Sequence, residues 1–464
     1  MSDVGRTRAG PRAGPRAATS AATSAVASVA ASAVTSAVAS VAASAVAAAV
    51  AEAHRNEWAF VLAATVHVAG DVDTAEEAVQ DAYASALATW GARGIPDRPG
   101  AWLTVAARRR ALDIRRRAAT AARALPKLVE PDDAALGMPG LEDDAIDGIR
   151  DDRLRLIFTC CHPALALDAQ VALTLRLLCG LSTAEVARAF LVPEPTMAAR
   201  ITRAKKKIQG AHIPYREPPV SELPERIDGV LSVVYLIYTT GHTAPSGANL
   251  MRRDLAERGH ELARMLRTLL PENRDVAGLL ALVLLTDARR NARLDGEREL
   301  VLLADQDRSV WDRAAIDEGI ALVRESLRVR RPGGGQSRFA LMAAIAAVHD
   351  EAASWNETDW GEILGLYDML IDIWTSPVVR LNRAIALGFA RGFAVGLAEL
   401  DELGADPQLA RYPYLAAARA DFLVRLGRRA DARIAYEEAL VLTDNETERA
   451  FLQARLDASS IEPR

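Results

Sequence analysis

Residues 173–208 have the sequence LTLRLLCGLSTAEVARAFLVPEPTMAARITRAKKKI, which contains the clearest structural signals in the chain. An apolar run over residues 171–179 is followed by Gly180, and glycine suits the position just past a helix end. Ser182 and Glu185 then have the spacing of a capping box, which marks the start of another helix. The sequence therefore predicts two short helices joined by a tight turn.

A third helix is predicted after a break at residues 191–194, because Pro195 suits the first turn of a helix. Its apolar residues recur with helical spacing on one face: Met197, Ile201, Ala204 and Ile208. A second stripe beside this face is polar and mostly basic: Thr196, Arg200, Arg203 and Lys207. A tight break followed by a helix with these two faces is typical of a helix-turn-helix that binds nucleic acid. The alternative is a helical hairpin with a solvated basic face.

A second basic cluster lies upstream, between residues 101 and 129. Its only acid is Asp113, against eight basic residues: Arg108, Arg109, Arg110, Arg115, Arg116, Arg117, Arg123 and Lys127. A rigid loop with Pro96 and Pro99 precedes it, and Trp102 enters a helix directly after that loop. Positive charge binds phosphates, and an aromatic ring can stack on an unpaired base. This pattern favours single-stranded nucleic acid as a partner, with a solvated helix end as the alternative.

Three motifs together resemble a known family: TAEEAVQDAYASALATW at 74–90, PDRPGAWLTVAARRRALDIRRR at 96–117 and LSTAEVARAFLVPEPTMAARITRAKKKI at 181–208. In order, spacing and charge, residues 51–209 resemble an extracytoplasmic-function sigma factor of bacterial RNA polymerase, in the sigma-70 family. The resemblance implies a first domain that binds core polymerase and melts the minus-ten promoter element. It implies a second, helix-turn-helix domain that recognises the minus-thirty-five element. The chain beyond it resembles the subgroup with a tetratricopeptide-like C-terminal domain.

The resemblance also implies roles for individual residues. On the first motif, four would bind the core polymerase: Glu76, Glu77, Gln80 and Asp81. Around the second motif, six would contact minus-ten DNA: Pro96, Trp102, Arg108, Arg109, Arg115 and Arg116. On the third motif, seven would contact minus-thirty-five DNA: Glu194, Thr196, Arg200, Arg203, Lys205, Lys206 and Lys207. The three lysines suit phosphate contacts, which position a protein on DNA without specifying sequence. For the acidic helix the alternative is an ordinary solvated face.

Composition fits an all-α protein of several domains. The chain has 464 residues, of which 50% are hydrophobic and 5% aromatic, and its net charge is -5. The positive charge is therefore local, as expected for a protein with one polyanionic partner and further protein partners. No phosphate loop, dinucleotide fingerprint or nucleophile elbow occurs, so we expect neither an enzyme nor a cofactor. His242, in the polar loop 241–247, is at best a binding residue.

Changes in composition predict the domain boundaries. Residues 1–50 form a low-complexity extension that is expected to be disordered, and residues 51–120 form the first sigma domain. An acidic, proline-bearing linker at 121–147 leads to the helix-turn-helix domain at 148–211. A second proline-rich linker at 212–224 precedes a helical, tetratricopeptide-like regulatory domain at 225–464. In this last part Pro377 and Pro413 begin two similar segments, about 36 residues apart, close to the repeat length of that architecture. A plain helical bundle is the alternative.

The cysteines favour a reducing compartment. Cys160, Cys161 and Cys179 form no disulfide framework, which fits a cytoplasmic protein. Cys160, Cys161 and His162 are adjacent, whereas a structural zinc site needs four spaced ligands. We therefore predict buried thiols and no metal.

The expected partners are the bacterial RNA polymerase core, promoter DNA, and a protein or peptide on the C-terminal helices, with no membrane. The alternative function is a helix-turn-helix regulator or repeat scaffold that acts without polymerase.

Overall fold

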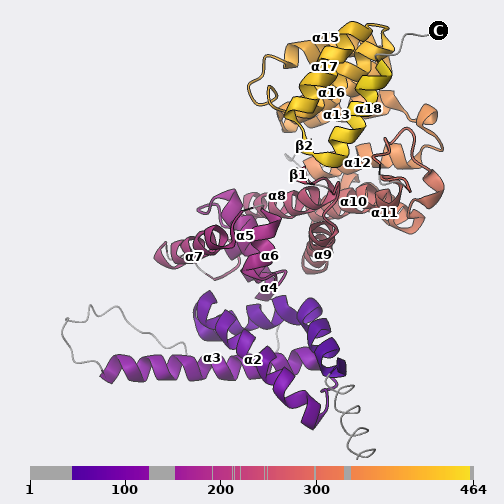
Figure 1. The fold of residues 1–464 in the computed structure, drawn as a ribbon. Helices are drawn as coiled ribbons and strands as arrows, with labels where there is room; N and C mark the ends of the chain where they lie inside the picture. The colour runs from indigo at the N-terminus through magenta and orange to yellow at the C-terminus, as the bar shows by residue number, and fades with distance from the viewer. Residues whose placement is uncertain are drawn as a thin grey trace, which may run out of the picture. The chain divides into compact units, whose positions relative to one another are not determined.

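The computed structural model describes residues 44–124, 152–190, 192–211, 213, 215–219, 221–244, 246–247, 249–296, 299–328 and 336–459. Within these ranges the predicted all-α fold is confirmed (Figure 1). The strands described are two-residue segments, β1 (Ser246–Gly247) and β2 (Asp444–Asn445), which pair in parallel. The chain divides into two compact units, Met1–Ala145 and Ile146–Arg464. Most of the predicted N-terminal extension and of the acidic linker, and the glycines at 333–335, lie outside the described residues.

The first unit is built from a helix that covers residues 44–69, α2 (Val72–Arg93) and α3 (Pro99–Ala124). The side chain of Asp71 caps α2 by accepting a hydrogen bond from the Thr74 amide at 2.8 Å. Residues 44–50, assigned from sequence to the extension, belong to the first helix, where Val46 and Val50 are buried. The boundary predicted at residue 51 therefore lies inside a helix, because small residues that look like low-complexity sequence also pack well between helices.

The second unit begins with α4 (Asp152–Cys160), α5 (Leu167–Leu177), α6 (Thr183–Ala189) and α7 (Glu194–Gly210). The predicted capping box is confirmed: the Glu185 amide donates to Ser182 Oγ at 3.2 Å, and the Ser182 amide donates to Glu185 Oε2 at 2.7 Å. The four residues predicted to face inward on α7 are all buried: Met197, Ile201, Ala204 and Ile208. Helix, tight turn and helix are thus present as predicted.

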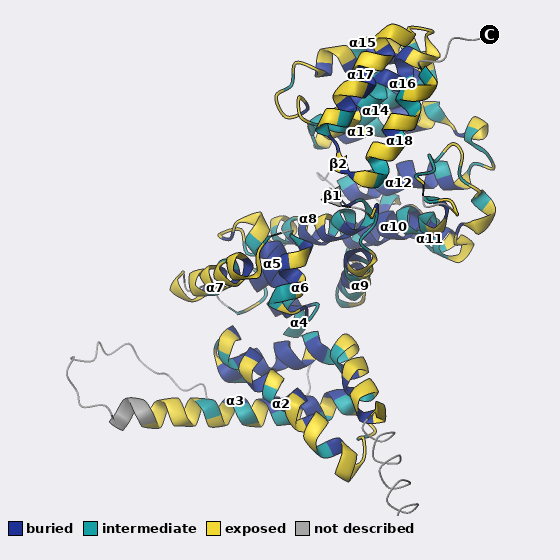
Figure 2. Ribbon diagram, viewed as in Figure 1, coloured by how far each residue is buried: buried dark blue, intermediate teal, exposed yellow. Residues whose placement is uncertain are grey.

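A layer of longer helices follows: α8 (Leu223–His242), α9 (Arg253–Leu269), α10 (Arg274–Ala288), α11 (Arg313–Leu327) and α12 (Arg338–Glu351). Every residue from Val276 to Leu285 on α10 is buried, because α10 packs against α9, α11 and α12 (Figure 2). In the sequence, residues 249–270, 275–290 and 313–330 show the apolar periodicity of helices, and they correspond to α9, α10 and α11. This layer packs against the helix-turn-helix segment through α8, which contacts α4 and α5. It packs against the C-terminal helices through α12, which contacts α13 (Trp360–Ile373).

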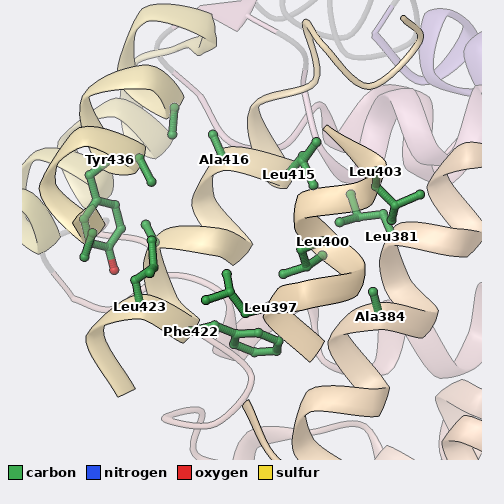
Figure 3. Packing of buried hydrophobic residues seen from close by; sticks show 14 of the residues in the cluster. Leu381, Ala384, Leu397, Leu400, Leu403, Leu415, Ala416, Phe422, Leu423 and Tyr436 are labelled. Carbon is green, nitrogen blue, oxygen red and sulfur yellow. The ribbon is translucent and has the colours of Figure 1, made fainter. Parts of the chain in front are cut away.

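The C-terminal part contains α13 (Trp360–Ile373), α14 (Pro377–Arg391), α15 (Phe393–Leu403), α16 (Pro413–Arg425), α17 (Arg429–Leu442) and α18 (Glu446–Ser459). Pro377 and Pro413 are the first residues of α14 and α16, where a missing amide proton costs no helical hydrogen bond. The helices pack in successive pairs, α14 with α15 and α16 with α17. Leucine side chains from α14 and α15 meet Phe422 of α16 in one core (Figure 3).

The helix-turn-helix segment also packs on the helices that follow it. Arg226 of α8 donates a hydrogen bond to the carbonyl of Phe158 at 2.5 Å, and its guanidinium lies 5.8 Å from the Phe158 ring centroid. The Tyr215 hydroxyl donates to the carbonyl of Asp152 at 3.3 Å. These contacts lie within one compact unit. The division into two domains at 212–224 stays a prediction.

The burial predicted for the thiols is confirmed for two of them. Cys160 and Cys161 are buried, whereas Cys179 is partly exposed. Burial raises the pKa of the Cys161 thiol to about 12, and burial also raises the pKa of Cys160 well above its ordinary value. Among the described residues, no group of three His, Cys, Asp or Glu side chains is arranged to hold a metal ion.

The native protein is expected to protect Cys160 and Cys161 from thiol reagents at pH 8. The thiolate is the reactive form, and a pKa near 12 leaves almost all of the Cys161 thiol protonated at that pH. Labelling with Ellman's reagent, followed by peptide mass spectrometry, measures the protection site by site. Both residues should react after unfolding in guanidinium. Burial also raises the pKa of the partly exposed Cys179 thiol to about 12, so Cys179 should react slowly in the native protein as well. Fast labelling of Cys161 in the folded state would contradict the burial.

Candidate nucleic-acid interface

Five of the polar residues predicted for DNA contact are exposed on α7. They define the recognition face: Glu194, at the first residue of the helix, and Thr196, Arg203, Lys206 and Lys207. The opposite side of α7 is anchored in the core, so the helix presents this face on a fixed support. Residues near the start of such a helix reach base edges, and cations further along reach phosphates. No other described part of the second unit buries the side chains of this face.

Arg200 and Lys205 differ from the rest of the predicted set, because both are partly buried. Arg200 Nη1 lies 3.4 Å from the carboxylate of Asp168 on α5, and its guanidinium lies 5.5 Å from the Phe190 ring centroid. Arg200 therefore fastens α7 to α5 and to the end of α6. Sequence spacing alone puts Arg200 and Arg203 on one stripe, and it carries no signal for the partners of Arg200.

The predicted polymerase-binding residues on α2 also divide into exposed residues and residues that are buried or paired within the fold. Glu77 and Gln80 are exposed, whereas Glu76 is only 5% exposed and accepts a hydrogen bond from Gln80 Nε2 at 3.5 Å. Asp81 accepts a hydrogen bond from Arg110 Nε of α3 at 2.5 Å. Arg110 also lies 4.0 Å from Glu77. The polar surface available on α2 thus consists mainly of the acids Glu77 and Asp81 and the neutral amide of Gln80.

Two of the predicted arginines on α3 also bind the first helix. Arg108 Nε donates to the carbonyl of Ala64 at 3.1 Å, and Arg115 Nη1 donates to the carbonyl of Val68 at 2.8 Å. The carbonyl of Val68 is among the last four of its helix, which have no partner within the helix, and cations are favoured at this end. Arg109 and Arg116 lie on another side of α3, and Arg116 lies 3.4 Å from Asp113. All four arginines are exposed, so Arg108 and Arg115 combine a contact with the first helix and an open side.

The aromatic ring predicted to meet an unpaired base is held in place by a second tryptophan. Trp102 is partly buried, and its ring centroid lies 5.5 Å from that of the buried Trp90 in an edge-on arrangement. The loop before α3 is exposed at Gly94, Ile95 and residues 97–98, and Pro96 is half-buried. Trp90 gave no separate signal in the sequence, because its role depends on the packing of α2 against α3.

Two segments of the second unit match known family models. Residues 155–208, which span most of α4 to α7, match the family model of sigma-70, region 4. Residues 226–327 match a family of unknown function (DUF6596). The helix-turn-helix segment therefore resembles sigma-70 region 4, and this match supports a sigma-factor-like role in transcription.

The chain also belongs to one family with an uncharacterized protein of Rhizobium meliloti (strain 1021). The two sequences are 39% identical over 398 residues, which is 85% of this chain and 92% of that protein. No solved structure matches the chain. None of the helices in the described ranges has an apolar run long enough to span a bilayer.

Proposed function

We propose that the protein is a sigma factor of the extracytoplasmic-function group, which directs bacterial RNA polymerase to specific promoters in the cytoplasm and starts transcription there. The observation that supports this most directly is the exposed recognition face of α7 within the sigma-70 region 4 match. Glu194, Thr196 and Arg203 would contact base edges of the minus-thirty-five element. Lys206 and Lys207 would neutralise phosphates. The protein supplies binding energy and performs no bond chemistry.

In the first unit, we assign core binding to Glu77, Gln80 and Asp81 of α2. Arg109 and Arg116 on α3 would follow the strand that separates at the minus-ten element, with Trp102 and the loop at 94–98 against the unpaired bases. Holding a base out of the stack costs a few kcal/mol, which phosphate contacts and stacking must offset. Arg108 and Arg115 would act mainly by fixing the first helix against α3.

The C-terminal helices would form a tetratricopeptide-like regulatory domain. The pairs α14–α15 and α16–α17 each begin at a proline and share one core, which is how helical repeats stack. Such stacks present a surface for a protein or peptide, and we propose that this part sets when the sigma units engage polymerase or promoter.

Run-off transcription tests the proposal. Purified bacterial core polymerase is incubated with and without the full-length protein on DNA from upstream of its own gene and neighbouring operons. A discrete transcript that requires the protein is the expected outcome. Specific binding to duplex DNA without any binding to core polymerase would instead favour the regulator that acts without polymerase. Absence of both core binding and specific DNA binding would overturn the assignment.

A further inference from the structure

The C-terminal end of α6 is capped by a residue from outside the region 4 match. Arg252, directly before α9, donates from Nη1 to the carbonyl of Arg188 at 3.0 Å and to the carbonyl of Ala189 at 2.8 Å. Carbonyls in the last turn of a helix have no partner within the helix, and a cation there is favoured by the helix dipole. Arg252 therefore holds α6 at the point where the chain turns toward the recognition helix α7.

Arg252 is itself held firmly. Its side chain is 19% exposed, and its Nη2 lies 3.5 Å from the carboxylate of Asp254. Its backbone amide donates to the carbonyl of Gly241, in the last turn of α8, at 2.7 Å. The guanidinium thus has a fixed base on the α8–α9 layer, so it acts as a rigid support for α6.

The segment that leads to Arg252 is tied to the far end of the chain. We define the described residues 244, 246–247 and 249–252 as the strap. Asn445, between α17 and α18, is 0% exposed, and its Nδ2 donates to the carbonyls of Ala244 at 3.1 Å and Asn249 at 3.0 Å. Its Oδ1 accepts hydrogen bonds from the amides of Thr447 at 3.0 Å and Glu448 at 3.2 Å, at the start of α18. The pairing of β1 with β2 adds a backbone connection at the same place.

The strap is also bordered by two cavities. One, of about 750 Å³, is lined by Arg252 and Thr447, and the other, of about 980 Å³, is lined by Arg293 and Tyr414. Leu250 of the strap lines both. An occupant of either cavity, or a shift of the α17–α18 junction, would therefore act on the strap directly.

We infer that the strap couples the C-terminal helices to the helix-turn-helix, with Arg252 as a positioning residue for DNA recognition. The inference rests on the proposed function, because it specifies how the regulatory helices reach the DNA-reading helix. A contiguous chain of contacts can carry energetic coupling between two sites, and Asn445, the strap, Arg252 and the α6 carbonyls provide one. The effect is transmitted through the support of α7, and the recognition face itself stays uncovered.

Hydrogen exchange of the full-length protein tests the first half of the coupling. Arg252→Ala is expected to speed amide exchange in α6 and the first turn of α7 by about tenfold, because two hydrogen bonds from a charged donor are lost. Arg253→Ala, which removes the same charge from the exposed neighbouring residue, should leave these rates unchanged. The amide exchange rates of Arg252→Lys in α6 should lie between those of the two alanine variants. This variant provides the test if Arg252→Ala unfolds. Unchanged exchange in α6 in both Arg252 variants would overturn the inference.

Asn445→Ala tests the second half. Exchange should rise in the strap and also in α6, whereas Asp444→Ala, at the exposed neighbouring residue, should affect neither. Amides of α2 and α3, in the other compact unit, provide an internal reference for general unfolding. A looser strap with unchanged exchange in α6 would overturn the coupling. These measurements need neither DNA nor polymerase, so their failure is distinct from a failure of the sigma-factor assignment.

A DNA-binding series separates positioning from direct contact. Arg252→Ala should weaken promoter binding without changing its salt dependence, whereas Lys206→Ala should reduce the salt slope by about one. A reduced salt slope in Arg252→Ala would show that Arg252 is a phosphate contact and would overturn its positioning role.

Discussion

Arg203→Ala is expected to weaken promoter binding by about tenfold to a hundredfold, the cost of losing one good base contact of about 1–3 kcal/mol. Arg203 is exposed on the recognition face, on a helix whose other side is buried in the core, so the helix backbone already has a fixed position from which the guanidinium can reach a base edge. Fluorescence anisotropy with labelled duplexes of the promoter and of scrambled sequence measures the loss. A base contact should affect the promoter duplex much more than the scrambled one.

The matched control for this variant is Arg411→Ala, which removes one positive charge at an exposed position among the C-terminal helices. Arg411→Ala should change neither the affinity for the promoter duplex nor the affinity for the scrambled duplex. Arg200→Ala should differ from both, because breaking the contact with Asp168 also lowers the stability of the second unit. Equal losses for Arg203 and Arg411 would show that only overall charge matters, contrary to the assigned role.

Gly241→Ala is expected to destabilise the second unit by about 3 kcal/mol or more, the upper range for overpacking. A methyl group at Gly241 would lie 2.2 Å from the Ala256 nitrogen and 2.7 Å from the Leu255 carbonyl carbon. Both atoms belong to the backbone of α9, which cannot rotate away as a side chain can, so α8 and α9 must separate. Chemical denaturation followed by circular dichroism measures the loss as a lower midpoint.

The same helix provides the control. At Gly229, also on α8, a methyl group in place of the α-hydrogen would have no atom within 4 Å beyond its own helix backbone and chain neighbours. Gly229→Ala should therefore stabilise the protein by about 0.5–1 kcal/mol, because alanine has the higher helix propensity. Both substitutions replace glycine with alanine, yet they should change the free energy of unfolding in opposite directions. A Gly241→Ala protein as stable as the parent would show that α8 and α9 do not approach as closely as described.

Local signals were enough to predict most of the helices near the DNA-binding site. The Ser182–Glu185 capping box and the apolar spacing of α7 both appear as predicted. Pro377 and Pro413 mark helix starts for the same kind of reason. Each signal involves residues at most a few positions apart, so the helix forms or ends according to its own neighbours. The family resemblance rested on these same local patterns, and the region 4 match agrees with it.

Local sequence signals could not predict which arginines hold the helices together and which remain available to bind DNA. Arg200 and Arg203 look equivalent in the sequence, and the structure pairs Arg200 with Asp168 while it leaves Arg203 exposed. Arg108 and Arg115 likewise donate hydrogen bonds to carbonyls of the first helix, although both are exposed in the same way as Arg109. One guanidinium can bind a phosphate, a carboxylate or a helix end, and the choice depends on which of these the fold brings within about 3 Å.

Helix boundaries, caps and the inner face of α7 therefore follow from short-range hydrogen bonding and periodicity, which are properties of neighbouring residues. The role of each polar side chain depends on partners far along the chain. Asn445 holds the loop at Ala244 and Asn249, and Arg252 holds the end of α6. No periodic pattern links these positions, because each contact depends on how the packed helices place two distant segments side by side, and that placement is a property of the whole core.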